Sequence, residues 1–210
     1  MKKFIVILVL CFVGNSFSLH AQMGKRTYVN QTEIGLMNYG FIPIQNSYSF
    51  LTMHGLKLTE SWELGLSSGV EKYTADEYEK FWVLPFNVAG RFILNPHKRT
   101  TFYSGLDAGY GFAGLNSTAD KVWNNTVTEK DRSFKGGLRF HPHVGWRWKV
   151  GAERTFISLS IGYQFQQIKL ERSKLRPVFD GFLNNNLDNY YHERVTYNMG
   201  RAVVKVGMGF

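Results

Sequence analysis

Two histidines separated by one residue have a spacing that could hold a metal ion. His141 and His143 lie at i and i+2 in this 210-residue chain, so in an extended strand both side chains point to the same side. Two ligands are fewer than the four of a usual structural zinc site, and the sequence offers no evident partner. We therefore expect no metal and no cofactor, and interpret the pair as histidines hydrogen-bonded to neighbouring carboxylates or water.

A set of charged residues shares this two-residue phase on the polar side of extended segments. If those segments close into a narrow barrel, the set points into a lumen just wide enough for side chains, where unpaired charge is costly. We interpret it as a salt-bridged network that fills the interior, and the alternative is a selective path for ions or protons. Its members are Glu33, Glu63, Arg91, Asp107, Arg139, Arg147, Arg201 and Lys205.

The elements that must position these residues are strands, because apolar residues alternate with polar ones. In the segment 138–150, Phe140, Val144 and Trp146 fall on one face, whereas Arg139 and Arg147 fall on the other. Similar alternation covers 62–70, 82–94, 102–112, 155–166 and 195–210, with weaker patterns near 29–41 and 48–58. This gives eight candidates of the length that a tilted membrane-spanning strand needs. His54 shares a face with apolar residues of its segment, which is odd for a face that meets lipid.

The connections and aromatic residues favour a membrane barrel over a soluble one. Short turns are expected near 59–61, 95–99 and 151–154, and longer polar links near 72–80, 115–135 and 171–194. Short turns on one rim and long loops on the other are typical of outer-membrane barrels. Aromatic residues gather at the strand ends, as the two bilayer interfaces select: Trp62, Phe102, Trp146 and Trp148 beside the short turns, and Tyr73, Trp82, Phe112 and Phe165 beside the long loops.

The N-terminus predicts export. Lys2 and Lys3 precede an apolar run at 4–13, which is too short to span a bilayer, and Ala21 offers a site for signal-peptidase cleavage. We expect a signal peptide at 1–21 and a mature domain at 22–210, with an uncleaved anchor helix as the alternative. The only cysteine, Cys11, lies in the signal, so the mature chain has no thiol chemistry.

Two terminal features resemble those of known families. The last strand carries Val204, Val206, Met208 and Phe210, and this ending resembles the signature that the barrel-assembly machinery recognises. The sequence Leu19-His20-Ala21-Gln22 resembles the signal ending of exported Bacteroidetes proteins. With eight strands, the chain is similar to small outer-membrane barrels of the OmpA/OmpX-like type. The resemblance implies an all-β, eight-stranded antiparallel transmembrane β-barrel in the outer membrane of a Gram-negative bacterium, in contact with its lipid.

The expected function is non-enzymatic. The sequence has no HExxH, nucleophile elbow, P-loop or Rossmann glycine pattern, and no histidine is followed two residues later by the serine found in lipid-modifying barrel deacylases. Despite a formal net charge of +9, no basic run with interleaved aromatics points to nucleic acid. We expect a role in envelope integrity, adhesion or docking. The alternatives are a lipid-modifying barrel enzyme and a secreted lipocalin-like binding barrel.

The longer links are the expected contact surface for a protein partner. The link at 171–194 holds the most aromatic residues, which are the usual anchors of protein interfaces. Pro177 and the run at 184–186 argue against simple extension of the strands, so the segment should fold over the barrel mouth or reach outward. Candidate contacts are Phe179, Phe182, Tyr190 and Tyr191.

Overall fold

The computed structural model describes residues 28–38, 47–74, 80–114, 121–123, 126–151, 155–175 and 190–210. Every regular element in these ranges is a strand, and none of them contains a helix long and apolar enough to cross a membrane. The strands that form the barrel wall are β1 (Tyr28–Asn38), β2 (Ser47–Lys57), β3 (Trp62–Thr74), β4 (Lys80–Leu94), β5 (Thr100–Ala113), β8 (Gly137–Lys149), β9 (Phe156–Leu175) and β10 (Tyr190–Gly209).

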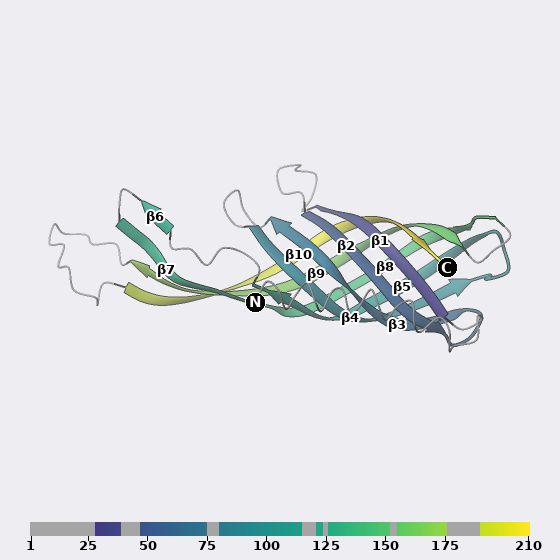
Figure 1. The fold of residues 1–210 in the computed structure, drawn as a ribbon, viewed down its shortest axis with the longest axis horizontal. Coiled ribbons are helices and arrows are strands. Elements are labelled where there is room, and N and C mark those ends of the chain that lie inside the picture. Colours follow the sequence, from purple (N-terminus) through teal and green to yellow (C-terminus); the bar gives the residue numbers. More distant parts are fainter. Residues whose placement is uncertain are drawn as a thin grey trace, which may run out of the picture.

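Eight of the described strands form a closed antiparallel ring in the order β1-β2-β3-β4-β5-β8-β9-β10 (Figure 1). The ring closes where β10 pairs with β1, from Asn38 opposite Ala202 to Gln31 opposite Gly209. Phe210 adds two backbone hydrogen bonds to Asn30, each 3.0 Å long. Closure removes the free sheet edges, so the wall can satisfy its backbone groups without water.

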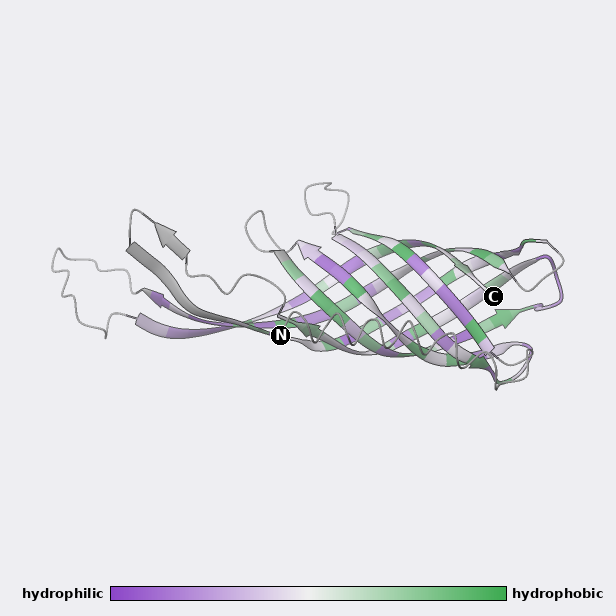
Figure 2. Ribbon diagram, in the orientation of Figure 1, coloured by the Kyte–Doolittle hydropathy of each residue, from purple (hydrophilic) through white to green (hydrophobic). Residues whose placement is uncertain are grey.

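The alternation expected from the sequence sets which side chains face outward. In β8 the burial alternates along the whole strand, with Arg139 buried and Leu138 66% exposed. Figure 2 shows the same banding of hydrophobic and hydrophilic residues across the barrel wall. The exterior carries exposed apolar side chains on every strand of the ring, among them Ile34, Phe50, Leu66, Val88, Leu106, Phe140, Ile161 and Val206. This is the arrangement of a barrel whose outer surface meets lipid.

Short turns join the strands at one end of the barrel. Leu58 donates to the carbonyl of Trp62, Lys98 to that of Asn95 and Val150 to that of Thr155. Asn95 takes a positive φ of 55°, a conformation that asparagine adopts more readily than most residues. The C-terminal Phe210 lies at this end, opposite the long connections (Figure 1). By the rule that outer-membrane barrels have short periplasmic turns, this is the periplasmic end.

Two segments that the sequence analysis assigned to loops continue as strands. Within 115–135 lie β6 (Lys121–Trp123) and β7 (Thr126–Lys135), and β7 pairs with β9 between Glu129 and Lys135. Within 171–194, the described residues 171–175 and 190–194 belong to β9 and β10, which pair with each other over twenty residues. The prediction of loops is therefore wrong for these described residues, since the strands run beyond the barrel (Figure 1), and the rest of both links lies outside the described residues. We call β6, β7, residues 169–175 and residues 190–196 the β-extension.

The expected boundary of the third strand is also wrong. The alternation of apolar residues predicted an end near residue 70, with Glu71 and Tyr73 beyond it, whereas β3 continues to Thr74. Glu71 and Tyr73 are fully buried. Tyr73 therefore points into the barrel and does not belong to the outer aromatic girdle. Other predicted girdle residues do lie on the exterior, with Trp62 53% and Phe112 56% exposed.

Candidate functional site: the lumen network

The structure places all eight predicted lumen charges inside the barrel, and none is more than 5% exposed. They come from β1, β3, β4, β5, β8 and β10, and strand alternation turns each of them inward. Because the lumen is narrow, side chains from strands that are not neighbours in the ring reach one another. The resulting contacts form three tiers along the barrel axis.

The tier nearest the periplasmic end is centred on Arg147. Its guanidinium pairs with Glu63 at 2.9 Å and donates a hydrogen bond to Gln31 at 2.7 Å. Gln31 in turn donates to Glu33 at 2.7 Å. The guanidinium carbon of Arg147 also lies 4.4 Å from the ring centroid of Phe156 and 4.7 Å from that of Tyr103. Arg147 is thus fixed by charge, by hydrogen bonds and by aromatic packing.

The middle tier joins two carboxylates with three basic side chains. Arg91 pairs with Asp107 at 2.5 Å, and His141 approaches the other carboxylate oxygen of Asp107 at 3.3 Å. Lys205 lies 3.7 Å from Glu33 and 3.3 Å from Nδ1 of His141. These contacts connect the middle tier, through Glu33, to the tier nearest the periplasmic end.

The upper tier contains residues that the sequence analysis did not assign to the lumen. Arg139 pairs with Glu71 at 2.7 Å, and Glu71 also accepts hydrogen bonds from Gln164 and Tyr73, each at 2.9 Å. The predicted network had five basic and three acidic members, so Glu71 supplies a fourth acid. Arg201 lies in this region too and donates to the carbonyl of Thr74.

The histidine pair does not form a favourable cation site. The ligand atoms of Asp107, His141 and His143 lie within 4.8 Å of one another. However, Asp107 is already paired with Arg91, and Lys205 contacts His141. A metal ion there would face two fixed positive charges before it gained three ligands. The two imidazole rings instead stack at a centroid distance of 4.7 Å, which agrees with a structural interpretation of the pair.

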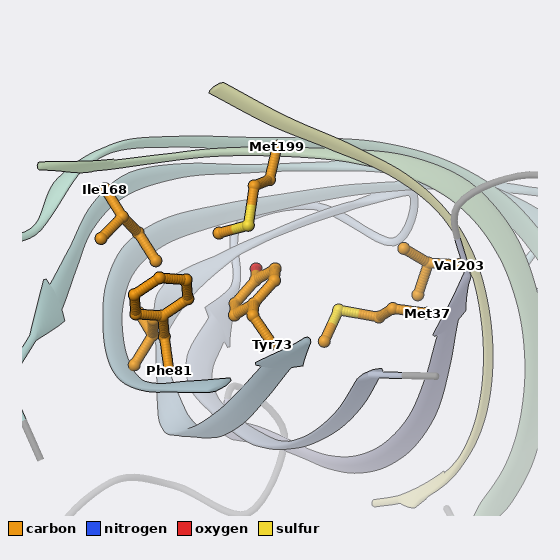
Figure 3. Packing of buried hydrophobic residues seen from close by; sticks show 7 residues of the cluster. Met37, Tyr73, Phe81, Ile168, Met199 and Val203 are labelled. Atoms are coloured by element: carbon orange, nitrogen blue, oxygen red, sulfur yellow. The ribbon is translucent and has the colours of Figure 1, made fainter. Parts of the chain in front are cut away.

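An apolar cluster lies in the barrel at the end opposite the short turns (Figure 3). Partly buried Phe134 and Tyr197 pack against its edge. Such a cluster was not expected, because the lumen of a small barrel is usually polar. Its side chains cover the upper tier of charges on its extracellular side. Its buried members are Met37, Tyr73, Phe81, Val83, Ile168, Met199 and Val203.

At the periplasmic end the barrel opens into a pocket of about 660 Å³. The pocket is lined by Tyr28, Lys57, Lys149 and Phe210 at its rim, among others, and it reaches the Glu63–Arg147 pair. The lumen therefore consists of an open periplasmic pocket, a charged middle and an apolar upper end. Chemically, the paired side chains of this arrangement fix the charges in place.

The other predicted site residues lie outside the lumen or outside the described ranges. Val204, Val206, Met208 and Phe210 face outward, with 43–62% exposure. Tyr190 and Tyr191 lie at the start of β10, opposite Leu175 and Lys174. Phe179 and Phe182 fall outside the described residues, as does the predicted signal peptide at 1–21, so the signal peptide, its cleavage after Ala21 and the Bacteroidetes-like ending stay predictions.

Comparison with known proteins supports the architecture. No family model and no curated protein matches the sequence. The fold is similar to that of the outer membrane protein OprG from Pseudomonas aeruginosa, with a TM-score of 0.60 at 9% identity over 87% of this chain and 93% of that one. It is also similar to Neisserial surface protein A, with a TM-score of 0.50 at 11% identity over 89% of this chain and 98% of that one. Together with the apolar exterior, these likenesses show that the chain has the fold of small outer-membrane β-barrels.

Proposed function

We propose that this barrel is a non-enzymatic docking or adhesion protein, which binds a partner outside the cell through its β-extension. The observation that carries the proposal is the continuation of β9 and β10 beyond the ring, where β7 joins them. A strand that only crosses the membrane needs about 9–11 residues, whereas β9 and β10 each have 20. The surplus length is thus not needed for insertion.

The filled lumen supports a role at the surface over one in transport. Three tiers of paired charge and an apolar cluster occupy the interior, so solute would have to displace fixed side chains. A role in envelope integrity would be served by such a closed barrel without any partner. Such a role would not require the β-extension.

Ion pairs between strands hold the β-extension in shape. Glu171 of β9 pairs with Lys135 of β7 at 2.7 Å and with Arg194 of β10 at 2.9 Å. The next residue, Arg172, points to the other face and pairs with Glu193 at 2.7 Å. Both faces of the sheet are therefore tied across strands, and a preorganised surface loses less entropy on binding than a flexible loop.

The β-extension also presents side chains suited to an interface. Exposed His192, Arg194 and Thr196 follow one another on one face of β10. Tyr190 and Tyr191 begin the strand, next to the segment that carries Phe179 and Phe182 in the sequence. Tyrosine, phenylalanine and arginine are enriched at protein interfaces, so these residues are the proposed contacts.

A shortened barrel tests the proposal. Glu171 and Arg194 are direct antiparallel partners, so residues 172–193 can be replaced by an Asn-Gly hairpin turn. We expect the variant to remain heat-modifiable and in the outer membrane but to lose partners that co-purify with the native protein. The double variant Tyr190→Ser/Tyr191→Ser keeps the length of the strands and removes only the tyrosine side chains. It therefore distinguishes the effect of losing these contacts from the effect of losing the strands. Retention of every native partner by the shortened barrel would rule the proposal out.

Assembly is proposed to depend on the outward residues of the last strand. Val204, Val206 and Met208 form a continuous apolar row on the exterior of β10, and Phe210 extends the row directly after the strand. We propose that the barrel-assembly machinery binds this row before the strand pairs with β1. The row is accessible from the lipid side, which is consistent with recognition of an unpaired strand.

A further inference from the structure

A group of polar side chains faces outward on the wall that is expected to meet lipid. Tyr28, Asn30 and Thr32 of β1 and Thr52 and His54 of β2 lie on the same face as the strongly exposed Ile34, Leu36 and Phe50, and Ser68 of β3 continues the group. We call these six residues the outer polar patch. Polar groups in contact with hydrocarbon are costly, so a patch of this size needs a reason to be there.

Five of the six patch residues form a connected hydrogen-bond network, and Ser68 lies beside it. Strand register places Thr32 opposite Thr52 and Thr52 opposite Ser68, which gives a row of hydroxyls across three strands. The hydroxyl oxygens of Thr32 and Thr52 are 3.2 Å apart. Nδ1 of His54 lies within hydrogen-bond distance of the Tyr28 hydroxyl and of the Asn30 amide nitrogen, the latter at 3.1 Å. The six side chains are only half-buried, so they also face out of the wall.

The orientation of His54 argues against hydrolysis of lipid at this site. The amide nitrogen of Asn30 also donates to the carbonyl of Met53 at 3.3 Å, so this nitrogen, and not the amide oxygen, faces His54. Nδ1 of His54 therefore accepts, and the ring proton lies on Nε2, 3.5 Å from the Thr52 hydroxyl. A base that activates Thr52 would need the opposite tautomer, with a bare Nε2.

The chemistry of the patch fits a second copy of the same chain. The outward positions of β1 and β2 carry no charged side chain in their described residues, so a phosphate headgroup finds no arginine or lysine there. Threonine, serine, asparagine and histidine can each donate and accept a hydrogen bond, which makes the patch complementary to itself. Self-complementarity is what a two-fold symmetric contact requires.

The surroundings of the patch fit such a contact within a membrane. Small hydroxyl residues at its centre allow close approach of two backbones, as small residues do at transmembrane interfaces. Around them lie large apolar side chains, with Ile34 66%, Met208 62% and Leu66 52% exposed. We propose that two copies of the barrel associate through the outer polar patch, with hydrogen bonds at the centre and apolar side chains against lipid at the margin.

Cysteine cross-linking in the outer membrane tests this association. Thr52 lies at the centre of the patch, and a residue near a two-fold axis meets its own copy. In a Cys11→Ser background, Thr52→Cys should shift under mild oxidation to a band of twice the monomer mass. The matched control is Val144→Cys, which is also outward and five residues from the periplasmic end of its strand, but on β8.

A second variant removes the polar groups and keeps the fold. Thr32→Leu/Thr52→Leu places apolar side chains on the lipid face, where they are compatible with a monomeric barrel. We expect this variant to stay heat-modifiable. In phosphatidylethanolamine–phosphatidylglycerol vesicles, the native protein should form the dimer and the variant should not. Equal cross-linking at Thr52→Cys and Val144→Cys, cross-linking of Thr52→Cys only to another protein, or an undiminished dimer in the leucine variant would overturn the proposal.

Discussion

Arg139 of β8 and Glu71 of β3 form a fully buried ion pair of 2.7 Å between strands that are not neighbours in the ring. Arg139 has a second partner in Gln164, at 3.0 Å, and Glu71 accepts from Tyr73. The pair therefore links β3, β8 and β9 through the lumen, in addition to the backbone bonds around the wall. A closed wall and a cross-linked interior stabilise each other.

Breaking this pair should destabilise the barrel. Glu71→Gln keeps the shape of the side chain but leaves Arg139 buried without its counter-charge, and removal of one partner of a buried pair typically costs about 3–5 kcal/mol. We expect a clear fall in the urea midpoint for refolding in lipid vesicles. Lys135→Gln at the exposed end of the Lys135–Glu171 pair is the control, with an expected loss of about 0–1 kcal/mol. Similar losses in both variants would contradict the assigned role of the pair.

The barrel could be predicted from the sequence because alternation carries most of the information. In β8 and in the barrel part of β10 the outward positions carry no polar side chain, so the inward positions of Arg139 and Lys205 follow directly. The prediction fails at Glu71 because its neighbour Lys72 faces outward near the rim, and the apolar half of the pattern is missing there. The β-extension was missed for a related reason. Beyond the membrane neither face needs to be apolar, so its strands have the composition of loops.

Spatial crowding inside the barrel also could not be predicted from the sequence. By phase alone, Gly207 is an inward position that would accept a small polar residue. In the structure a Cβ on Gly207 would lie 2.8 Å from the carbonyl oxygen of Thr32 and 2.8 Å from the hydroxyl of Ser158. Serine there would force a shift of the neighbouring backbone. Which residues meet across the lumen depends on register and ring closure, and these are set by long-range pairing.

Loss of the Phe210 ring should impair assembly in cells, whereas loss of the Phe156 ring should lower the stability of the folded barrel. Phe210 is 43% exposed at the end of the proposed assembly signal, whereas Phe156 is 7% exposed and packs on Arg147. Phe210→Ala keeps the two backbone bonds to Asn30, so it should lower the amount of assembled protein in cells but refold normally in vitro. Phe156→Ala should instead lower stability in vitro, because it opens a cavity beside a buried ion pair. Equal surface levels of both variants would count against the signal.

The purified barrel should show no large, steady conductance in planar bilayers. The Arg139–Glu71 and Arg147–Glu63 pairs cross the lumen, the Arg91–Asp107 pair of neighbouring strands points into it, and the apolar cluster covers its extracellular end. Water and ions would have to break these contacts to pass. A porin reconstituted in the same bilayer serves as the positive control. Stable channel steps from the purified protein would mean that the interior opens in the membrane, and the transport alternative would then be favoured.

The β-extension should lose order at low pH through Glu171. The pKa of this carboxyl lies below its ordinary value because Lys135 donates a hydrogen bond to it and Arg194 adds further attraction. A lowered pKa in the folded state means that the stabilisation is complete above the ordinary carboxyl pKa, about 4.3, and is lost as the pH falls through the lower folded value.

Amide hydrogen exchange across 169–175 and 190–196 measures this effect. Protection should be constant near neutral pH and should fall once the pH drops below the ordinary carboxyl range. Glu171→Gln removes the titrating group, so its protection should be lower at neutral pH and should change less on acidification. Lys135→Met removes the first hydrogen-bond donor and should move the loss of protection to higher pH, because the pKa of Glu171 then rises. If Glu171→Gln lost protection on acidification to the same extent as the native protein, the pH response of the β-extension would belong to another group.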